Sequence, residues 1–206
     1  VVRQQERTDA KRCYNNEFQL ALAIGLYAQD HDGYYPQGIS KTGLGWAGQI
    51  YPYVKSKEVF HCPTDQRGNL GSQTSGESPI SYALNSNLVG LRISDLDNTS
   101  ATVLLFETTG SYFDPESDDV PGVASKDYSP VGNGLDGQLR CRLGIAQGPV
   151  RYATGTFDRP THPDSQFFDH AVRHTDGAYY AYADGWVHQA IPERVSTGWN
   201  AKSETA

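Results

Sequence analysis

The feature that most constrains the fold is an unbroken helical stretch from Arg3 to Asp30. It consists of good helix formers with one tolerated glycine, Gly25, and it predicts a helix of about seven turns. Residues 3 to 12 are polar on every face, whereas the stretch from Phe18 to Ala28 is apolar nearly all round. This pattern predicts that the second part is buried in a core and that the first part projects into solvent or packs against a partner.

Length and charge exclude some functions. With 206 residues, the chain is long enough for one well-buried domain and does not require two. Its 24 acidic and 17 basic residues give a formal net charge of -7, without a basic stripe. Nucleic acid is therefore not an expected partner. No apolar run reaches the ~18 to 20 residues of a membrane helix, so we expect any anchor to lie upstream of Val1.

Turn and strand signals follow the long helix. Gly33 and Pro36 end it, and a short helix is predicted over residues 45 to 56. The dipeptide Asp184-Gly185 tolerates the positive φ of a tight turn and joins the last two strands as a hairpin. A segment rich in Gly, Asp, Pro and Ser, residues 108 to 173, is interpreted as an insertion. Strands are predicted at residues 80 to 86, 101 to 107, 178 to 184 and 186 to 191.

The hairpin carries an H-x(9)-D-G pattern formed by His174, Asp184 and Gly185. An extended chain separates the first two by about 33 Å, so a direct contact would need a bulge or a bend. The structural interpretation assigns Asp184-Gly185 to the turn and gives His174 a hydrogen bond to backbone at the strand entrance. Metal binding through His174, with Asp176 or a neighbour, is the alternative. Alternation places Tyr180, Tyr182 and Asp184 on one face of the strand and Tyr179, Ala181 and Ala183 on the other.

Two further groups of residues have the chemistry of metal ligands. His170 and His174 lie four positions apart, as zinc ligands on a helix often do, but no glutamate follows His170 to complete H-E-x-x-H. A set of His170, His174 and Asp176 is the basis of a metal-dependent hydrolase hypothesis. Calcium is the other candidate, because acidic loops offer hard oxygen ligands, and solvation of these loops is the competing interpretation. The acidic residues are Asp114, Glu116, Asp118 and Asp119, with Asp158 and Asp164 in a second loop.

Signals for catalysis are missing from the sequence. There is no G-x-S-x-G motif and no Gly-rich phosphate loop, and the stretch GNGLDG lacks the strand-to-helix context of a dinucleotide site. The chain is therefore predicted not to be an enzyme, with no catalytic residue assigned and no cofactor required.

The cysteines leave the redox compartment open. Cys13, Cys62 and Cys141 form neither a C-x-x-C pair nor another zinc-ligand spacing. One disulfide with one free thiol fits an exported protein, whereas three reduced thiols fit a cytosolic one.

The order of several motifs is similar to that of a known family. A polar helix opening before Cys13 is followed by an apolar continuation ending YAQDHDGYYP, and then by YPYVKSKEVFHCPTD, SYALNS, TVLLFE and H-x(9)-D-G. This order resembles the bacterial prepilin-like proteins with an H-X9-DG C-terminal motif, relatives of type II secretion pseudopilins. The matching pieces span nearly the whole chain except residues 108 to 173.

The resemblance implies a pilin-like α+β fold, in which a long N-terminal helix packs on an antiparallel β-sheet. Residues 1–206 would form one domain, with a stalk helix at residues 1–31 and a variable insertion at residues 108–173. The implied function is that of a structural subunit in a type IV pilus-like or pseudopilus-like filament. Its partners would be other pilin-like subunits, in a homo- or hetero-filament.

The resemblance also carries expectations about location and sites. The subunit would be exported to the cell envelope or extracellular space and anchored in the inner membrane, before assembly, by a hydrophobic helix upstream of Val1. A Cys13–Cys62 disulfide would tie the helix to a loop and leave Cys141 unpaired. Pseudopilins often carry calcium in a C-terminal loop, which directs attention to the acidic residues above.

A rival function of another class is a secreted or surface binding module. In this hypothesis, surface aromatic side chains of the 108–173 insertion recognise a glycan or a protein by stacking. The residues are Tyr112, Phe113, Tyr128 and Tyr152.

Overall fold

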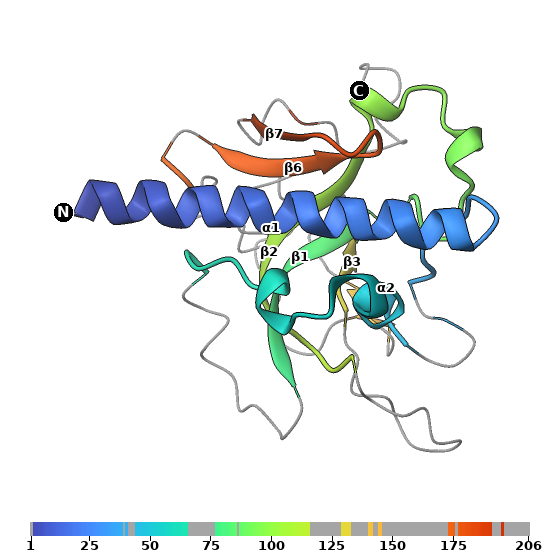
Figure 1. The fold of residues 1–206 in the computed structure, drawn as a ribbon, viewed down its shortest axis with the longest axis horizontal. Coiled ribbons are helices and arrows are strands. Elements are labelled where there is room, and N and C mark those ends of the chain that lie inside the picture. Colours follow the sequence, from blue (N-terminus) through green and yellow to red (C-terminus); the bar gives the residue numbers. More distant parts are fainter. Residues whose placement is uncertain are drawn as a thin grey trace.

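The protein is an α+β structure in which one long helix lies across a β-sheet (Figure 1). It is known from a computed structural model. The structure describes residues 2–38, 40, 44–65, 77–85, 87–115, 129–132, 140–141, 144–145, 173–175, 177–190 and 195. The predicted coarse class, an N-terminal helix with an antiparallel sheet, is confirmed.

Helix α1 (Val2–Asp30) agrees with the helix predicted from Arg3. Its first turns extend beyond the rest of the described chain (Figure 1), and residues 3–8 are exposed. One face of the remaining turns is buried, with Leu20 and Ile24 fully covered. Because the apolar positions at i and i+4 share a helix face, this face packs on the sheet.

The prediction that the second part of α1 is buried all round is wrong for one face. Phe18, Leu22 and Leu26 are exposed to 40%, 55% and 39%. At 100° per residue, these positions lie on the side of the helix opposite Leu20 and Ile24. A single sheet covers one side of a helix, so an apolar sequence on the other side stays on the surface. We call these three residues the outer stripe of α1.

The sheet has the strand order β5-β4-β3-β1-β2-β6-β7. The pairs β1–β2, β2–β6 and β6–β7 are antiparallel. Strand β3 pairs parallel with β1. The short strands β4 and β5 continue the sheet antiparallel from β3. The strand bounds are β1 Ser78–Asn85, β2 Val103–Phe113, β3 Val131–Gly132, β4 Arg140–Cys141, β5 Gly144–Ile145, β6 Ala178–Tyr182 and β7 Val187–Ala190.

Strand β2 continues past its predicted end at residue 107. It runs to Phe113, which pairs with Ser78 of β1. Residues 108–113 therefore belong to the sheet and not to an irregular insertion. The sequence pattern fails here because TTGSY is polar and contains glycine, whereas pairing with β1 decides the conformation.

Shorter helical elements connect α1 to the sheet and link β1 to β2. The predicted second helix is α2 (Trp46–Val54), and it ends where Lys55 adopts a left-handed conformation with φ of 56°. The described residues also include the 3-10 turns η1 (Lys57–Phe60), η3 (Ile93–Asp95) and η4 (Thr99–Ala101). Of these, η1 contacts α1 and leads directly to Cys62.

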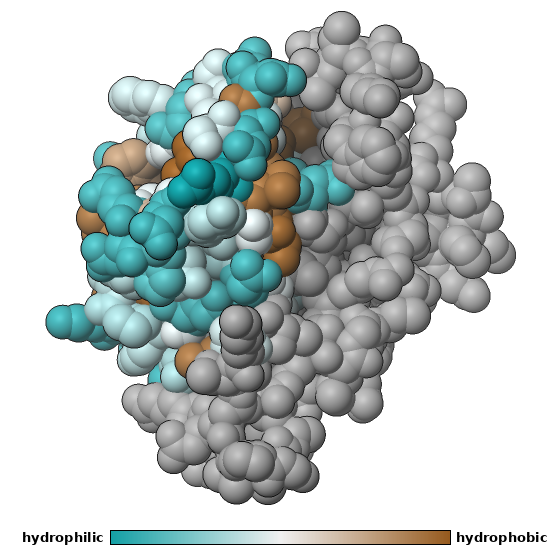
Figure 2. All heavy atoms as spheres, turned by 90° about the vertical axis from the view of Figure 1, so that its right-hand side faces the viewer, coloured by the Kyte–Doolittle hydropathy of each residue, from teal (hydrophilic) through white to brown (hydrophobic). Residues whose placement is uncertain are grey.

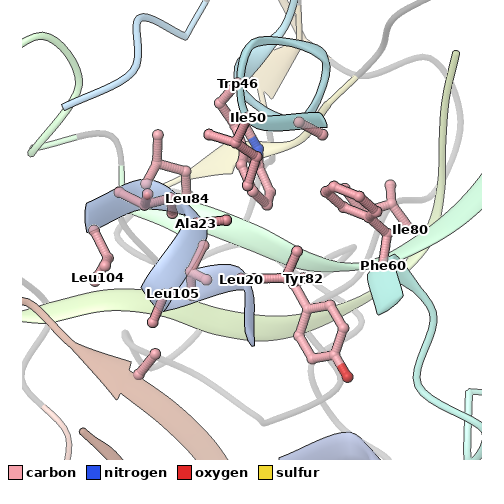
Figure 3. Close-up of a cluster of buried hydrophobic side chains, with 14 of the residues drawn as sticks. Leu20, Ala23, Trp46, Ile50, Phe60, Ile80, Tyr82, Leu84, Leu104 and Leu105 are labelled. Atoms are coloured by element: carbon pink, nitrogen blue, oxygen red, sulfur yellow. The ribbon is translucent and has the colours of Figure 1, made fainter. Parts of the chain in front are cut away.

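The main core lies between α1, α2 and one face of the sheet (Figure 3). Leu20 and Ala23 of α1 and Trp46 and Ile50 of α2 meet side chains of η1, β1 and β2 there. A second apolar cluster, including Phe106 and Tyr180, lies on the opposite face of the sheet.

The predicted alternation along β6 is confirmed. Tyr179, Ala181 and Ala183 pack with the main core, whereas Tyr180 and Tyr182 pack with the second cluster. Residue 184 lies beyond the strand, in the turn before β7.

Among the described helices, none combines the length and the apolar composition that crossing a membrane needs. Figure 2 looks at the end of the molecule where α1 finishes. There the described residues are mainly hydrophilic, with hydrophobic residues in small separate groups, as is normal for a surface.

Candidate functional site

Polar side chains gather between α1 and the sheet, next to the main core. Helix α1 supplies Cys13 and Glu17, which share a face because they are four residues apart. The segment after η1, strands β1 and β2, and the residues just before β6 supply the others. We call this set the buried polar cluster: Cys13, Glu17, Cys62, Asp65, Ser81, Glu107, Arg173 and His174. Each of these side chains is buried, and both cysteines, Glu17, Ser81 and Glu107 are fully covered.

Glu107 is the hub of the cluster. His174 Nε2 lies 2.9 Å from its Oε1, and the backbone N–H of Tyr179 donates to Oε2 at 3.2 Å. Arg173 Nη1 lies 3.8 Å from Oε1. A buried carboxylate is tolerated only when charges and hydrogen bonds compensate its lost hydration, and Glu107 has both.

Arg173 connects Glu107 to a second buried carboxylate. Its guanidinium donates to the backbone oxygen of Thr108 at 2.6 Å and lies 3.7 Å from Asp65 Oδ2. The Ser81 hydroxyl donates to the same Asp65 oxygen at 2.8 Å and accepts from the Cys62 N–H at 3.1 Å. The bulge in the β1–β2 pair lies on β2: Ser81 alone separates the pairs Ile80–Ser111 and Tyr82–Glu107 on β1, whereas β2 has three residues between them.

Glu17 connects helix α1 to strand β6. Its Oε1 accepts from the backbone N–H of Ala181 in β6 at 2.9 Å, while Oε2 is buried without a hydrogen-bond partner. Burial, and next the charge of Glu107, raise the pKa of Glu17 well above its usual value. The protonated form is therefore favoured over a wider pH range than for an exposed glutamate.

A disulfide between Cys13 and Cys62 links α1 to the segment after η1. This is the pairing that the resemblance implies. The Thr64 hydroxyl oxygen lies 2.9 Å from Cys62 Sγ. Cys141 lies in β4, and its side chain is outside the described part of the structure.

The two ends of the H-x(9)-D-G motif have separate partners. The backbone of His174 forms a bridge with Gly177, with N–H···O distances of 3.1 Å in both directions, and its ring bonds to a carboxylate where the sequence suggested backbone. Asp184 Oδ1 accepts from the Trp186 N–H at 3.1 Å, and Gly185 has φ of +89°. Asp184-Gly185 therefore forms the hairpin turn.

The other predicted metal ligands are not brought together among the described residues. Asp114 is buried just after β2, and the remaining members of its calcium set, Glu116, Asp118 and Asp119, lie outside the described residues. His170, Asp176, Asp158 and Asp164 lie outside them as well.

Of the four aromatic residues in the binding-module hypothesis, two lie within the described residues and two lie outside them. Phe113 is fully buried, with its ring 4.4 Å from that of Phe60, so the prediction that it is a surface aromatic is wrong. Tyr112 pairs with Pro79 in the sheet, and Tyr128 and Tyr152 lie outside the described residues.

Sequence reasoning missed most of the cluster, although weak signals exist. Glu17 is the one charged residue between Cys13 and Ala28. Glu107 ends the apolar run VLLF, and Arg173 directly precedes the motif histidine. A charge inside an apolar pattern is informative because burying it requires a partner elsewhere in the chain.

Comparisons with known proteins do not assign a family. Protein-family models, curated proteins and solved structures all give no match to the chain. The function is therefore inferred from the geometry of α1 and the buried polar cluster.

Proposed function

We propose that this chain is a structural, non-catalytic subunit of a pilus-like or type II secretion pseudopilus-like assembly. It acts at the cell envelope or outside the cell and is anchored, before assembly, by a hydrophobic helix upstream of Val1. Its partners are other pilin-like subunits, which pack against it through α1.

The observation that carries the proposal is the outer stripe of α1. Phe18, Leu22 and Leu26 form a continuous apolar row, with spacing i, i+4, i+8, on a helix whose other face is already packed. Exposed apolar side chains in a row are typical of helix-to-helix contacts between subunits. Beyond Phe18, helix α1 continues into its projecting polar first turns, which a neighbouring subunit can also reach (Figure 1).

The buried polar cluster supports the proposal because it anchors α1 to the domain. The Cys13–Cys62 disulfide and the Glu17–Ala181 hydrogen bond both cross from α1 to other elements. A helix that transmits force within a filament needs such an anchor. Structural disulfides also favour an oxidising compartment outside the cytosol.

A surface substitution tests the proposal. Leu22→Glu is to be compared with the matched control Gln189→Glu, at an exposed position of β7, in cells that produce the full-length protein. Burying a leucine side chain in an interface contributes about 1.5–3 kcal/mol. We therefore expect Leu22→Glu to lower incorporation at least about tenfold, measured by sedimentation of sheared surface material and by electron microscopy.

Thermal unfolding of the purified variants separates assembly from folding. Both variants should unfold at the temperature of the unmodified chain, because both positions are exposed. Incorporation of Leu22→Glu at the level of Gln189→Glu would disprove the role of the outer stripe. Recovery of the full-length protein as a soluble monomer alone would disprove the proposed function.

A further inference from the structure

Four members of the buried polar cluster have the side chains of a metal site. The sulfurs of Cys13 and Cys62, a carboxylate oxygen of Glu107 and a ring nitrogen of His174 all lie within 4.8 Å of one another. All four residues are buried, and they come from four different parts of the chain. In the structure, the disulfide occupies both sulfurs.

We propose that reduction of the Cys13–Cys62 disulfide converts these four side chains into a zinc site. The disulfide and the metal are then alternative cross-links at one position. The oxidised chain holds α1 by a covalent bond, and the reduced chain holds it by coordination.

The donor set fits zinc. Two thiolates, an imidazole and a carboxylate are all zinc ligands, at about 2.3 Å for sulfur, 2.0–2.1 Å for nitrogen and 2.0–2.2 Å for oxygen. Around a tetrahedral ion, these lengths put nitrogen and oxygen ligands about 3.3 Å apart. His174 Nε2 and Glu107 Oε1 are already 2.9 Å apart, so the ion needs only a small separation of this pair.

The sulfurs require a larger change, which side-chain rotation supplies. Tetrahedral coordination places two zinc-bound sulfurs about 3.8 Å apart. The Cα atoms of Cys13 and Cys62 are 4.8 Å apart, and a broken disulfide leaves both side chains free to rotate about their Cα–Cβ bonds.

The exchange conserves charge in the buried cluster. A dithiol or phosphine reductant gives two electrons to the disulfide and is itself oxidised, and two protons produce the two thiols. Binding of Zn²⁺ releases those two protons. Two thiolates and one Zn²⁺ have no net charge, as the disulfide has none, so Arg173, Asp65 and Glu107 keep their charge balance.

Neighbouring groups are placed to support the four ligands. The Tyr179 N–H holds Glu107 Oε2, which leaves Oε1 directed at His174. The Thr64 hydroxyl, 2.9 Å from Cys62 Sγ, can donate to a thiolate. Hydrogen bonds of this kind orient metal ligands, and their loss typically lowers metal affinity about 10–100-fold.

The test uses the 206-residue chain and Co²⁺ as a coloured substitute for zinc. The chain is reduced with a phosphine, freed of metal by a chelator, and titrated with Co²⁺ and then with Zn²⁺. We expect one equivalent of tetrahedral Co²⁺ with thiolate charge-transfer absorption, displaced by Zn²⁺, and no such absorption with the oxidised chain. Zn²⁺ should also raise the unfolding temperature of the reduced chain.

Variants identify the ligands. Cys13→Ser, His174→Ala and Glu107→Gln should each lower affinity by more than about 100-fold, since loss of a ligand exceeds loss of a supporting hydrogen bond. The matched controls Cys141→Ser, His188→Ala and Glu58→Gln should retain the affinity of the unmodified chain. A reversed pattern, with the loss in the controls, would overturn the proposal.

A measurement on the unmodified chain decides the matter even if a variant does not fold. X-ray absorption of the zinc-loaded reduced chain should show two sulfur ligands at about 2.3 Å and two nitrogen or oxygen ligands near 2.0 Å. Any other ligand count, equal metal binding by the oxidised chain, or a reduced chain that stays unfolded with Zn²⁺ present would overturn the site.

Discussion

The two ends of the H-x(9)-D-G motif lie beyond opposite ends of strand β6 and have opposite surroundings. His174 is buried, and its ring bonds to Glu107, which is 67 positions away in the sequence. Asp184 is exposed and bonds to a residue two positions away. One short pattern thus combines a long-range contact at its first residue with a local turn at its last two.

The difference shows what each end contributes. The Asp184-Gly185 end determines a backbone conformation and depends on no distant residue. The His174 end depends on Glu107 and Arg173, and it lies next to α1, because Cys13 Sγ is within 4.8 Å of a carboxylate oxygen of Glu107. Substitutions at the His174 end should therefore weaken the attachment of α1, whereas those at the other end should affect one hairpin.

The largest effect is expected at Glu107. Glu107→Ala leaves the buried ring of His174 without its carboxylate and leaves the guanidinium of Arg173 with Asp65 alone, and breaking a buried ion pair costs about 3–5 kcal/mol. Urea unfolding at neutral pH measures this. Glu58→Ala, on an exposed residue of η1, should leave the unfolding midpoint unchanged, and an equal loss in both variants would refute the role of the hub.

His174→Ala should have the next largest effect. It removes one partner of a buried hydrogen bond, which costs about 1–3 kcal/mol. The control is His188→Ala on β7, where the side chain is exposed and a change within about 0.5 kcal/mol is expected. Equal free energies of unfolding for the two variants would show that His174 contributes no more to stability than the exposed His188.

Gly185→Ala addresses the turn end of the motif. Gly185 has φ of +89°, and an added Cβ would meet nothing within 4 Å, so the cost is backbone strain alone, about 1–2 kcal/mol. Hydrogen exchange should show faster opening of β6–β7, with protection of α1 unchanged. Loss of α1 protection in this variant would show that the two ends are coupled.

A pH dependence of stability is expected from Glu17. Its pKa is raised by burial, so the folded chain binds a proton that the unfolded chain has released above about pH 4.3. Its contribution to stability is complete below that pH and is lost as pH rises toward the raised pKa, with a slope of up to about 1.4 kcal/mol per pH unit. Glu17→Gln should remove this slope in urea unfolding measured across pH, and an unchanged slope would assign the effect to another group.

Much of the local structure can be predicted from the sequence because short-range rules govern it. The bounds of α1 and the position of α2 follow from helix formers and from the residues that stop them. The faces of β6 follow from alternation, and the hairpin turn follows from Asp184-Gly185. The end of β2 at Phe113 cannot be predicted from local sequence, because its polar residues form a strand only through pairing with β1.

The buried polar cluster depends on contacts that no local rule contains. Glu17 and Ala181 are 164 positions apart, and the bulge of β2 opposite Ser81 exists only when β1 pairs with β2. Likewise, helical periodicity places Phe18, Leu22 and Leu26 in a row, but only the packing of α1 on the sheet determines that this row faces outward.

The sequence by itself determined the long two-part helix, the hairpin and the coarse α+β class, since propensity, capping and alternation act over a few residues. Only the tertiary structure decided that His174 meets Glu107 beside a Cys13–Cys62 bridge. The physical reason is that a buried charge has to be compensated within a few ångströms in space, wherever in the chain its partners occur.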